Sequence, residues 1–450
     1  MRCSPALALA FALTACADTT TGPPEPVPLS LDAQLRQLIG GWGVVPIGAM
    51  PEQDSALVAL GRALFFDRVL SGNRDISCAT CHHPATALGD GLALAVGTGG
   101  TGAGTGRRPG PGRQFVSRSA PSLLNSGLGQ PYLFWDGRLS GFGFGGVHVD
   151  DGPLPPAGVT NALVAQALLP VVTREEMLGN PGDTDVFGQP NELAGFGPGQ
   201  ETEIRQAIMR RLLAHPEYVA LFAAAFPGKP ASALRFEDAA LALATFQRQA
   251  FTRTSSPFDR YLEREDHALT TAQKRGALLF FGQAQCGSCH SGPFLGGQNF
   301  ANVGAPQIGP GGRKAPPLDL GRGEVQDHAF YRFSFRVPPL RNVELTAPYM
   351  HSGAYATLEA VVRHYNDVPE ALRSYDVLEH APALAGSHHG DEATIAAVFE
   401  TLDARLRTPL DLSDEQVQDL VAFLKSLTDP AARDLGALVP ERVPSGLPVQ

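Results

Sequence analysis

The chain has 450 residues, which is enough for two or three domains. Its formal net charge is −10, from 45 acidic and 35 basic residues, and it has no long basic run, so nucleic acid is excluded as an expected partner. The 50 glycines and 38 prolines form no periodic repeat, a composition that favours long ordered loops around helices.

The N-terminus has the pattern of an export signal. Residues 1–16 combine one arginine with an apolar run that is too short to serve as a stable membrane span. The run ends in Leu-Thr-Ala-Cys, which resembles a bacterial lipobox, so we expect a lipoprotein anchored at Cys16 on the periplasmic side of the membrane. The alternative is an ordinary signal peptide and a soluble periplasmic protein. Loss of Cys3 and acylation of Cys16 would leave four cysteines and no disulfide, and residues 17–30 would form a Pro/Thr-rich tether.

Two pentapeptides of one pattern organise the chain. Residues 78–82 read Cys-Ala-Thr-Cys-His, and residues 286–290 read Cys-Gly-Ser-Cys-His. In this pattern two thiols attach covalently to a haem and the adjacent histidine becomes an axial ligand. A zinc ribbon would place its cysteine pairs roughly 15–20 residues apart, far closer than these. We therefore predict two covalently bound c-type haems, held by Cys78, Cys81, His82, Cys286, Cys289 and His290.

Hydrophobic periodicity predicts a mostly α fold. Helices are expected over residues 52–66, 202–226, 236–251, 357–366, 392–405 and 415–427. A further helix begins at Thr270, which forms a capping box with Gln273, and Ser413 with Gln416 caps the last helix. Strand signals are sparse, and residues 330–337 are the best candidate.

An internal repeat precedes the two haem motifs. The sequence Gly-Arg-Ala-Leu-Phe-Phe at residues 61–66 is echoed by Arg-Gly-Ala-Leu-Leu-Phe-Phe at residues 275–281. Each segment predicts a helix that delivers the chain to a haem motif. We therefore expect two cytochrome c-like haem domains, residues 31–258 and residues 259–450, with long Gly/Pro-rich loops; the last helices could pack back on the first domain.

These features resemble the bacterial di-haem cytochrome c peroxidases and their MauG-type relatives. Besides the haem motifs, the resemblance rests on Leu-Phe-Phe-Asp at residues 64–67, Phe-Trp-Asp-Gly-Arg at residues 134–138, and the segments at residues 336–342 and 348–353. It covers roughly residues 57–427. It implies a peroxidase-type oxidoreductase, nearest in style to the MauG-type and methanobactin-associated di-haem enzymes.

The resemblance makes the haem of His82 the one that binds peroxide. Peroxidases that need reductive activation place a distal histidine where this chain has Thr98. We therefore expect the sixth coordination position of this haem iron to be open. His148 is the alternative sixth ligand. Residues 97–112 are glycine-rich and either form a disordered insertion or cover one haem face, and a second glycine-rich insertion spans residues 141–158.

Three further residues have catalytic roles by resemblance. Trp135 is expected to relay charge between the haems. Gln166 and Glu176 keep the family's spacing of ten, and Glu176 is expected to move a proton between the peroxide oxygens, with Glu175 as the alternative.

The resemblance also suggests Tyr365 as the sixth ligand of the second haem. Peroxidases have a methionine at this position, whereas MauG-type enzymes have a tyrosine. A phenolate oxygen favours oxidised iron, so this haem would store an oxidising equivalent. His364, Met350 and His351 are rival ligands.

A calcium ion between the haem domains is a further implication of the resemblance. Thr346 and Pro348 match its backbone-carbonyl ligands. The expected side-chain ligand is an asparagine, which Ser119 replaces in this chain.

The resulting hypothesis is an enzyme that uses hydrogen peroxide to form a high-valent di-haem state and then oxidises a Trp-type side chain of a partner protein. The first alternative is a cytochrome c peroxidase that detoxifies hydrogen peroxide with electrons from a small cytochrome. The second is an electron-transfer cytochrome without catalysis. The membrane is expected as a partner only through the N-terminal lipid anchor.

Overall fold

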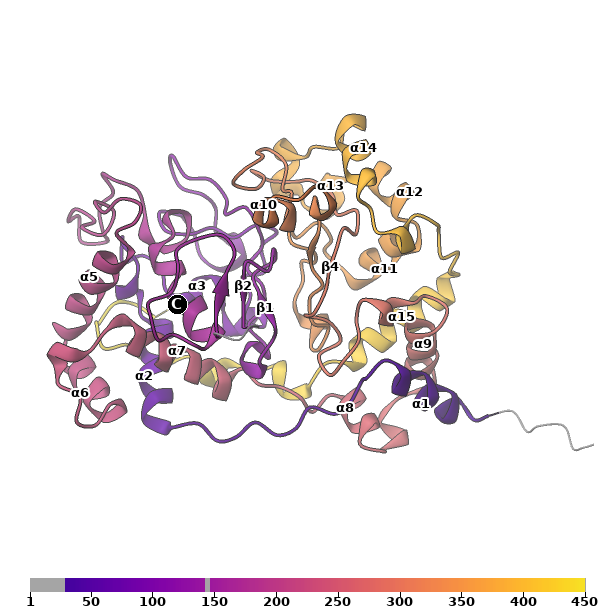
Figure 1. Ribbon diagram of the computed structural model, residues 1–450, viewed down its shortest axis with the longest axis horizontal. Coiled ribbons are helices and arrows are strands. Elements are labelled where there is room, and N and C mark those ends of the chain that lie inside the picture. Colours follow the sequence, from indigo (N-terminus) through magenta and orange to yellow (C-terminus); the bar gives the residue numbers. More distant parts are fainter. Residues whose placement is uncertain (1–28, 142–145, 450) are drawn as a thin grey trace, which may run out of the picture.

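The computed structural model describes residues 29–141 and 146–449 (Figure 1). The expected signal peptide, the lipid-anchor cysteine and nearly all of the tether lie outside these residues. The described chain is predominantly helical with little strand, as expected. No helix within it has the length and apolarity needed to cross a membrane.

The first half of the chain packs around two long helices. Its helices are α2 (Ser55–Phe66), α3 (Cys78–Cys81), α4 (Ala162–Ala167), α5 (Glu201–Leu213), α6 (Pro216–Ala225) and α7 (Phe236–Ala250). Helices α2 and α7 cross closely because Gly61 has no side chain: a Cβ there would lie 2.0 Å from the carbonyl oxygen of Ala242. Phe65, Phe66 and Phe246 fill the apolar cluster beside this crossing.

The second half repeats this arrangement. Its helices are α8 (Pro257–Leu262), α9 (Thr271–Phe281), α10 (Arg322–Gln326), α11 (Leu358–Asn366), α12 (Val368–Arg373), α13 (Val377–His380), α14 (Glu392–Glu400) and α15 (Asp414–Ser426). Helix α9 lies against α15 at Gly276, where a Cβ would come within 1.9 Å of the Asp419 carbonyl oxygen. Gly61 and Gly276 belong to the two copies of the sequence repeat. Each copy therefore allows a close helix crossing of the same kind, α2 with α7 and α9 with α15.

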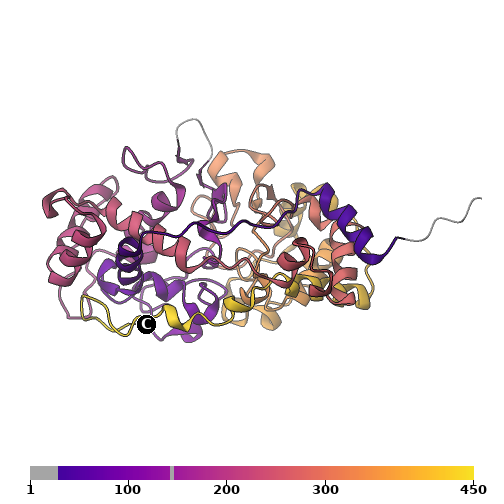
Figure 2. The same cartoon turned by 90° about the horizontal axis from the view of Figure 1, so that it is seen from below.

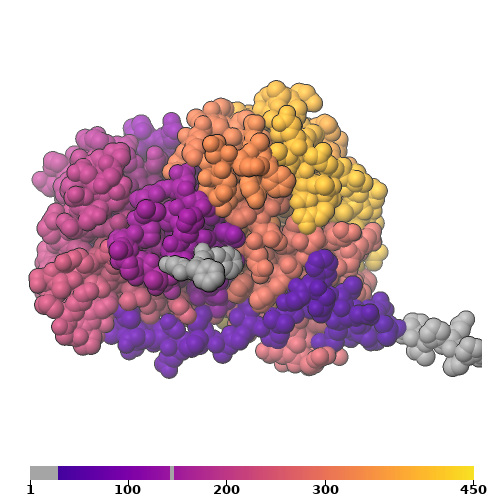
Figure 3. All heavy atoms as spheres, in the orientation of Figure 1, coloured from indigo at the N-terminus to yellow at the C-terminus, as the bar shows by residue number. Residues whose placement is uncertain are grey.

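The two halves exchange their terminal segments. Helix α1 (Leu31–Gly41) packs against α9, and its residues Leu35 and Ile39 belong to the second apolar cluster. Conversely, residues such as Leu435 and Val443 belong to the first cluster. Figure 2 shows the yellow C-terminal segment running beneath the first half, and Figure 3 shows the indigo N-terminal segment along one edge of both halves.

Short strands lie where the halves meet. Strands β1 (Tyr132–Leu133), β2 (Leu139–Ser140) and β3 (His148–Val149) form an antiparallel sheet, with Leu133 opposite Leu139 and Leu139 opposite Val149. Strands β4 (Phe300–Ala301) and β5 (Phe335–Arg336) form a second antiparallel pair. The strand predicted over residues 330–337 is thus confined to β5.

Most predicted helices are confirmed, and both predicted capping boxes are present. The single helix predicted over residues 202–226 is wrong. The chain breaks between α5 and α6, where Pro216 occupies the first turn of the new helix. The helix predicted over residues 392–405 ends at Glu400, and a separate turn spans Ala404–Leu406.

Candidate active site

The first haem motif forms a single helical turn, α3. At its start the N–H of Ser77 donates to the Thr80 hydroxyl at 2.9 Å, and the thiols of Cys78 and Cys81 are free. Burial raises the pKa of Cys78 to about 12, so this thiol is neutral. The Nδ1 atom of His82 lies 3.0 Å from the carbonyl oxygen of Leu88. Because a carbonyl only accepts, Nδ1 carries the proton and Nε2 keeps the lone pair that can bind a metal.

The second motif reproduces this geometry. Cys286 and Cys289 are free thiols at the turn Cys286–Ser288, and the Nδ1 atom of His290 lies 2.9 Å from the carbonyl oxygen of Leu295. Burial lowers the pKa of both His82 and His290 to about 4, so both imidazoles are neutral at pH 7. Two thiols followed by a neutral imidazole with a fixed tautomer fit a covalently attached c-type haem at each motif.

A glycine-rich loop lies beside the first motif and is ordered. Thr98 is only 3% exposed; its hydroxyl donates to Asp75 at 2.7 Å, and its N–H donates to the Glu176 carbonyl at 2.8 Å. Arg107 holds the loop by donating to the carbonyl oxygens of Val96 at 3.0 Å and Gly97 at 2.8 Å. Of the two alternatives predicted for residues 97–112, the one in which they form a disordered insertion is therefore wrong.

Glu176 lies on a π-helical turn, Arg174–Leu178. Burial raises the pKa of its carboxyl group, against the opposing charge of Arg138. The charge of Glu176 also contributes to the raised pKa of Cys81, which places the carboxylate on the side of the first haem motif. The alternative, Glu175, is exposed, and Gln166 is half-buried on α4.

His148 lies at the surface on β3. Its side chain is 66% exposed, and its Nε2 atom lies 2.9 Å from a carboxylate oxygen of Asp150. This position at the surface does not support His148 as the sixth ligand of a haem at His82.

Trp135 lies at the seam between the two halves. Its indole N–H donates to the carbonyl oxygen of Ser119 at 2.9 Å. Its own carbonyl oxygen accepts from the N–H of Arg336 at 2.7 Å, and the Arg336 guanidinium donates to Phe134 at 3.0 Å. Trp135 is thus held through its indole by the first half and through its backbone carbonyl by the second half.

Sequence reasoning missed a buried charge network beside Trp135. Arg118 forms an ion pair with Asp136 and donates to both carboxylate oxygens of Asp319, at 2.7 and 2.9 Å. Although burial opposes it, the charges of Arg118 and Arg138 hold the pKa of Asp136 well below its usual range. Asp136 and Arg138, which lie next to Trp135 in the sequence, could have indicated a charge network there. Nothing in the sequence links either residue to the distant partner Asp319.

Tyr365 lies near the second haem motif on α11. Burial raises the pKa of its hydroxyl, and the neighbouring thiols of Cys289 and Cys286 raise it further. The rival His364 has both ring nitrogens engaged, Nδ1 with the Tyr355 hydroxyl at 3.0 Å and Nε2 with the Val303 carbonyl at 2.8 Å. Tyr365 is therefore the better placed of the two.

The other two rivals pack elsewhere. The ring of His351 is stacked on Phe335, with ring centroids 3.6 Å apart. Met350 is partly buried against an apolar cluster that contains Leu94 and Tyr355.

The residues expected at the calcium site lie together. Ser119, Thr346 and Pro348 line one small cavity, together with Asp90. The Oδ2 atom of Asp90 is buried without a hydrogen-bond partner, and burial raises the pKa of this carboxyl to about 7. An unpaired buried carboxyl oxygen is the kind of ligand that a hard cation prefers. Within the described residues, no cluster of three His, Cys, Asp or Glu side chains could hold a metal by itself.

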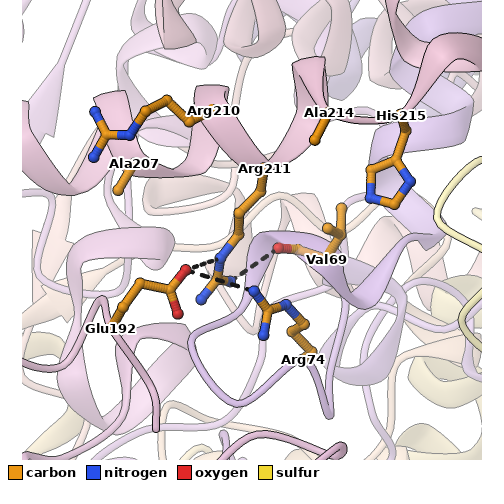
Figure 4. Close-up of a pocket in the computed structure, with 8 residues that line it drawn as sticks. All are labelled: Val69, Arg74, Glu192, Ala207, Arg210, Arg211, Ala214 and His215. Carbon is orange, nitrogen blue, oxygen red and sulfur yellow. Dashed lines mark hydrogen bonds and ion pairs between the residues drawn. The ribbon is translucent and has the colours of Figure 1, made fainter. Parts of the chain in front are cut away.

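A larger cavity of about 370 Å³ lies in the first half (Figure 4). None of its lining residues belongs to a haem motif. Arg211 points into it but donates to Glu192 at 2.6 Å and to the Val69 carbonyl at 3.2 Å. The Arg211 charge in this cavity is thus already paired within the protein.

The sequence matches known proteins along nearly its whole length. The family described as "Di-haem cytochrome c peroxidase" matches residues 55–267. The methylamine utilization protein MauG of Methylorubrum extorquens is 30% identical over 95% of this chain and 94% of its own. The cytochrome c551 peroxidase of Pseudomonas aeruginosa is 33% identical over 67% of this chain and 69% of its own.

A solved structure agrees with these relatives. A MauG-like protein associated with microbial copper homeostasis superposes with a TM-score of 0.57 and 27% identity, over 87% of this chain and 94% of the other. The two cysteine–histidine motifs, the seam tryptophan and the extent of these matches support one conclusion. The chain belongs to the di-haem cytochrome c peroxidase and MauG family of peroxidase-type oxidoreductases.

Proposed function

We propose that this enzyme uses hydrogen peroxide to oxidise a Trp-type side chain of a partner protein, as a MauG-type enzyme would. The observation that carries this proposal is Tyr365 on α11, whose pKa burial raises and which lies close enough to Cys286 and Cys289 for their charge to raise that pKa further, with its neighbour His364 engaged by other partners. An oxygen ligand favours an oxidised metal centre, which suits storage of an oxidising equivalent. The buried Thr98 supports the same assignment, since no histidine stands in its place.

The protein groups divide the chemistry between them. When bound at His82, a haem would supply the iron at which peroxide is cleaved. Glu176 is suited to move a proton between the two peroxide oxygens, because burial raises the pKa of its carboxyl group and so makes it bind a proton more readily than an exposed carboxyl group would. Gln166 would orient the peroxide from α4. Trp135, fixed from both halves, would carry the oxidising equivalent towards the side of His290 and Tyr365.

Several structural assignments belong to the same proposal. The haem of His82 would belong to a domain over residues 31–258, and that of His290 to a domain over residues 259–450. A lipid at Cys16 would hold the enzyme on the periplasmic side of the membrane. A calcium ion would bind between Thr346 and Pro348.

The competing function is peroxide detoxification fed by a small cytochrome, which the similarity to the cytochrome c551 peroxidase favours. Adding peroxide to the diferric enzyme without reductant distinguishes the two. The MauG-type function predicts a near-infrared absorption band from charge shared between the haems. Enzyme that reacts only after one electron has been supplied would instead be a peroxide scavenger.

The variant Tyr365→Phe tests the residue that carries the proposal. It should abolish the band while leaving both haems attached, because no cysteine changes. The matched control is Tyr349→Phe, whose hydroxyl contacts the Glu344 carbonyl at 3.3 Å. A band that persists in Tyr365→Phe would show that Tyr365 is not the ligand.

A further inference from the structure

A row of aromatic side chains connects Tyr365 with the protein surface. We call it the Tyr355 ladder; its members are Tyr365, His364, Tyr355, Tyr375 and His388. Successive ring centroids are 5.4, 5.3, 5.5 and 5.4 Å apart, within the range of direct aromatic contact. Tyr365 and His364 lie on α11, Tyr355 lies just before it, Tyr375 lies between α12 and α13, and His388 follows α13; Figure 1 shows these helices in orange.

Burial changes along the ladder. Tyr355 is 3% exposed, and His364 is 1% exposed. Tyr375 and His388 are partly exposed, as is Tyr365 at the other end of the ladder. The ladder therefore begins at the proposed haem ligand, passes through the buried His364 and Tyr355, and ends at the partly exposed Tyr375 and His388.

The hydrogen bonds assign a distinct role to Tyr355. His364 must donate from Nε2, because its partner, the Val303 carbonyl oxygen, can only accept. Its Nδ1 is then an acceptor, and the Tyr355 hydroxyl donates to it at 3.0 Å. Tyr375 differs, since its hydroxyl donates to the Ala354 carbonyl at 2.7 Å, which is no base. Tyr355 thus has a buried base within direct reach of its phenolic proton.

We propose that Tyr355 is a redox relay that passes an oxidising equivalent from Tyr365 to the surface at Tyr375. The proposal rests on the proposed function, in which hydrogen peroxide is the oxidant. Tyr355 gives one electron towards the Tyr365 side, its hydroxyl proton moves to Nδ1 of His364, and a neutral phenoxyl radical remains. Tyr375 then returns one electron to Tyr355 and releases its own proton to water. The proton on His364 moves back to Tyr355, so the pair is restored.

The relay predicts a tyrosyl radical in the holoenzyme after peroxide is added without a partner protein. Freeze-quench electron paramagnetic resonance should detect it, and incorporation of ring-deuterated tyrosine should narrow the signal. Tyr355→Phe keeps the packed ring and should reduce the signal at least about tenfold. Tyr331→Phe is the matched control: its ring lies 6.0 Å from that of His328, and no hydrogen bond joins the two within the described residues. An undiminished signal in Tyr355→Phe would overturn the relay.

A second variant tests the exit from the ladder. Tyr375→Phe removes the partly exposed phenol and leaves the Tyr355–His364 pair intact. The radical on Tyr355 should then decay more slowly, because its electron donor is lost. An unchanged decay would show that Tyr375 is not the next member.

Two readings separate failure of the relay from failure of the proposed function. A near-infrared band without any tyrosyl radical would overturn the relay and leave the proposed function standing. If wild-type enzyme shows no band, photogenerated tris-bipyridine ruthenium(III) can oxidise the ladder from its exposed end. A signal that depends on both Tyr375 and Tyr355 would then support the relay, and no such signal would overturn it.

Discussion

The buried ion-pair network beside Trp135 allows a quantitative prediction for Arg118→Met. Breaking a buried ion pair by removing one partner costs about 3–5 kcal/mol, because a charge is left uncompensated. Asp136 retains Arg138 at 3.0 Å, whereas among the described residues the side chain of Asp319 retains only the hydrogen bond from the N–H of Gly321 at 2.9 Å. The cost should therefore be that of one orphaned carboxylate, about 3–5 kcal/mol of unfolding free energy, rather than twice that.

The loss should depend on pH. In the wild type, although burial opposes it, Arg118 holds the pKa of Asp319 below its usual value. This contribution is present above the unfolded pKa of about 4 and is lost as pH falls through the lower folded value. Without Arg118, burial would raise the pKa of Asp319, so the folded variant would bind a proton more readily. The stability gap should be largest at pH 7 and shrink towards pH 4.

Urea unfolding of the holoenzyme at several pH values measures this gap. Adding Asp319→Asn to Arg118→Met should recover part of the loss, because the orphaned charge disappears. The control Arg433→Met breaks an exposed pair with Glu344 and should cost less than about 1 kcal/mol. A gap below 1 kcal/mol at pH 7, or one of constant size down to pH 4, would refute the assignment of Arg118 as the buried counter-ion.

Three further predictions concern other parts of the molecule. Glu176→Gln should slow peroxide cleavage in stopped-flow experiments about 10²–10⁴-fold, whereas the exposed Glu175→Gln should not; equal effects would reject Glu176 as the proton carrier. Gly276→Ala should cost about 1–3 kcal/mol in urea unfolding, because its Cβ would clash with the α15 backbone; a neutral effect would mean that the helices can separate freely. Asp90→Asn should weaken calcium binding in calorimetry by about tenfold or more, and an unchanged affinity would exclude this carboxylate from the site.

Sequence reasoning worked where the signal was local. The haem motifs, the capping boxes at Thr270 and Ser413 and the repeated glycine segment each lie within a few residues of what they control. The break at Pro216 was also local, because proline favours the first turn of a helix over its interior, but the apolar periodicity on both sides obscured it.

Long-range pairing could not be predicted. Arg118 and Asp319 are 201 residues apart, and nothing near either residue reveals the other. The same holds for Arg107, which fixes a glycine-rich loop through backbone carbonyl oxygens that any sequence would provide. The Tyr355–His364 pair spans only nine residues, yet its meaning depends on the Val303 carbonyl, which decides the tautomer.

The exchanged terminal segments impose an order on biogenesis. The first half cannot complete its apolar core until residues 432–447 have been made, because Leu435 and Val443 belong to that core and Ser445 hydrogen-bonds to the buried Asp67. Domains usually fold from the N-terminus as synthesis proceeds. Here the first half must wait for residues 432–447. Until then, Cys78 and Cys81 belong to an incompletely folded domain in which their thiols are accessible. We therefore expect this interval to leave Cys78 and Cys81 open to haem attachment before the molecule closes.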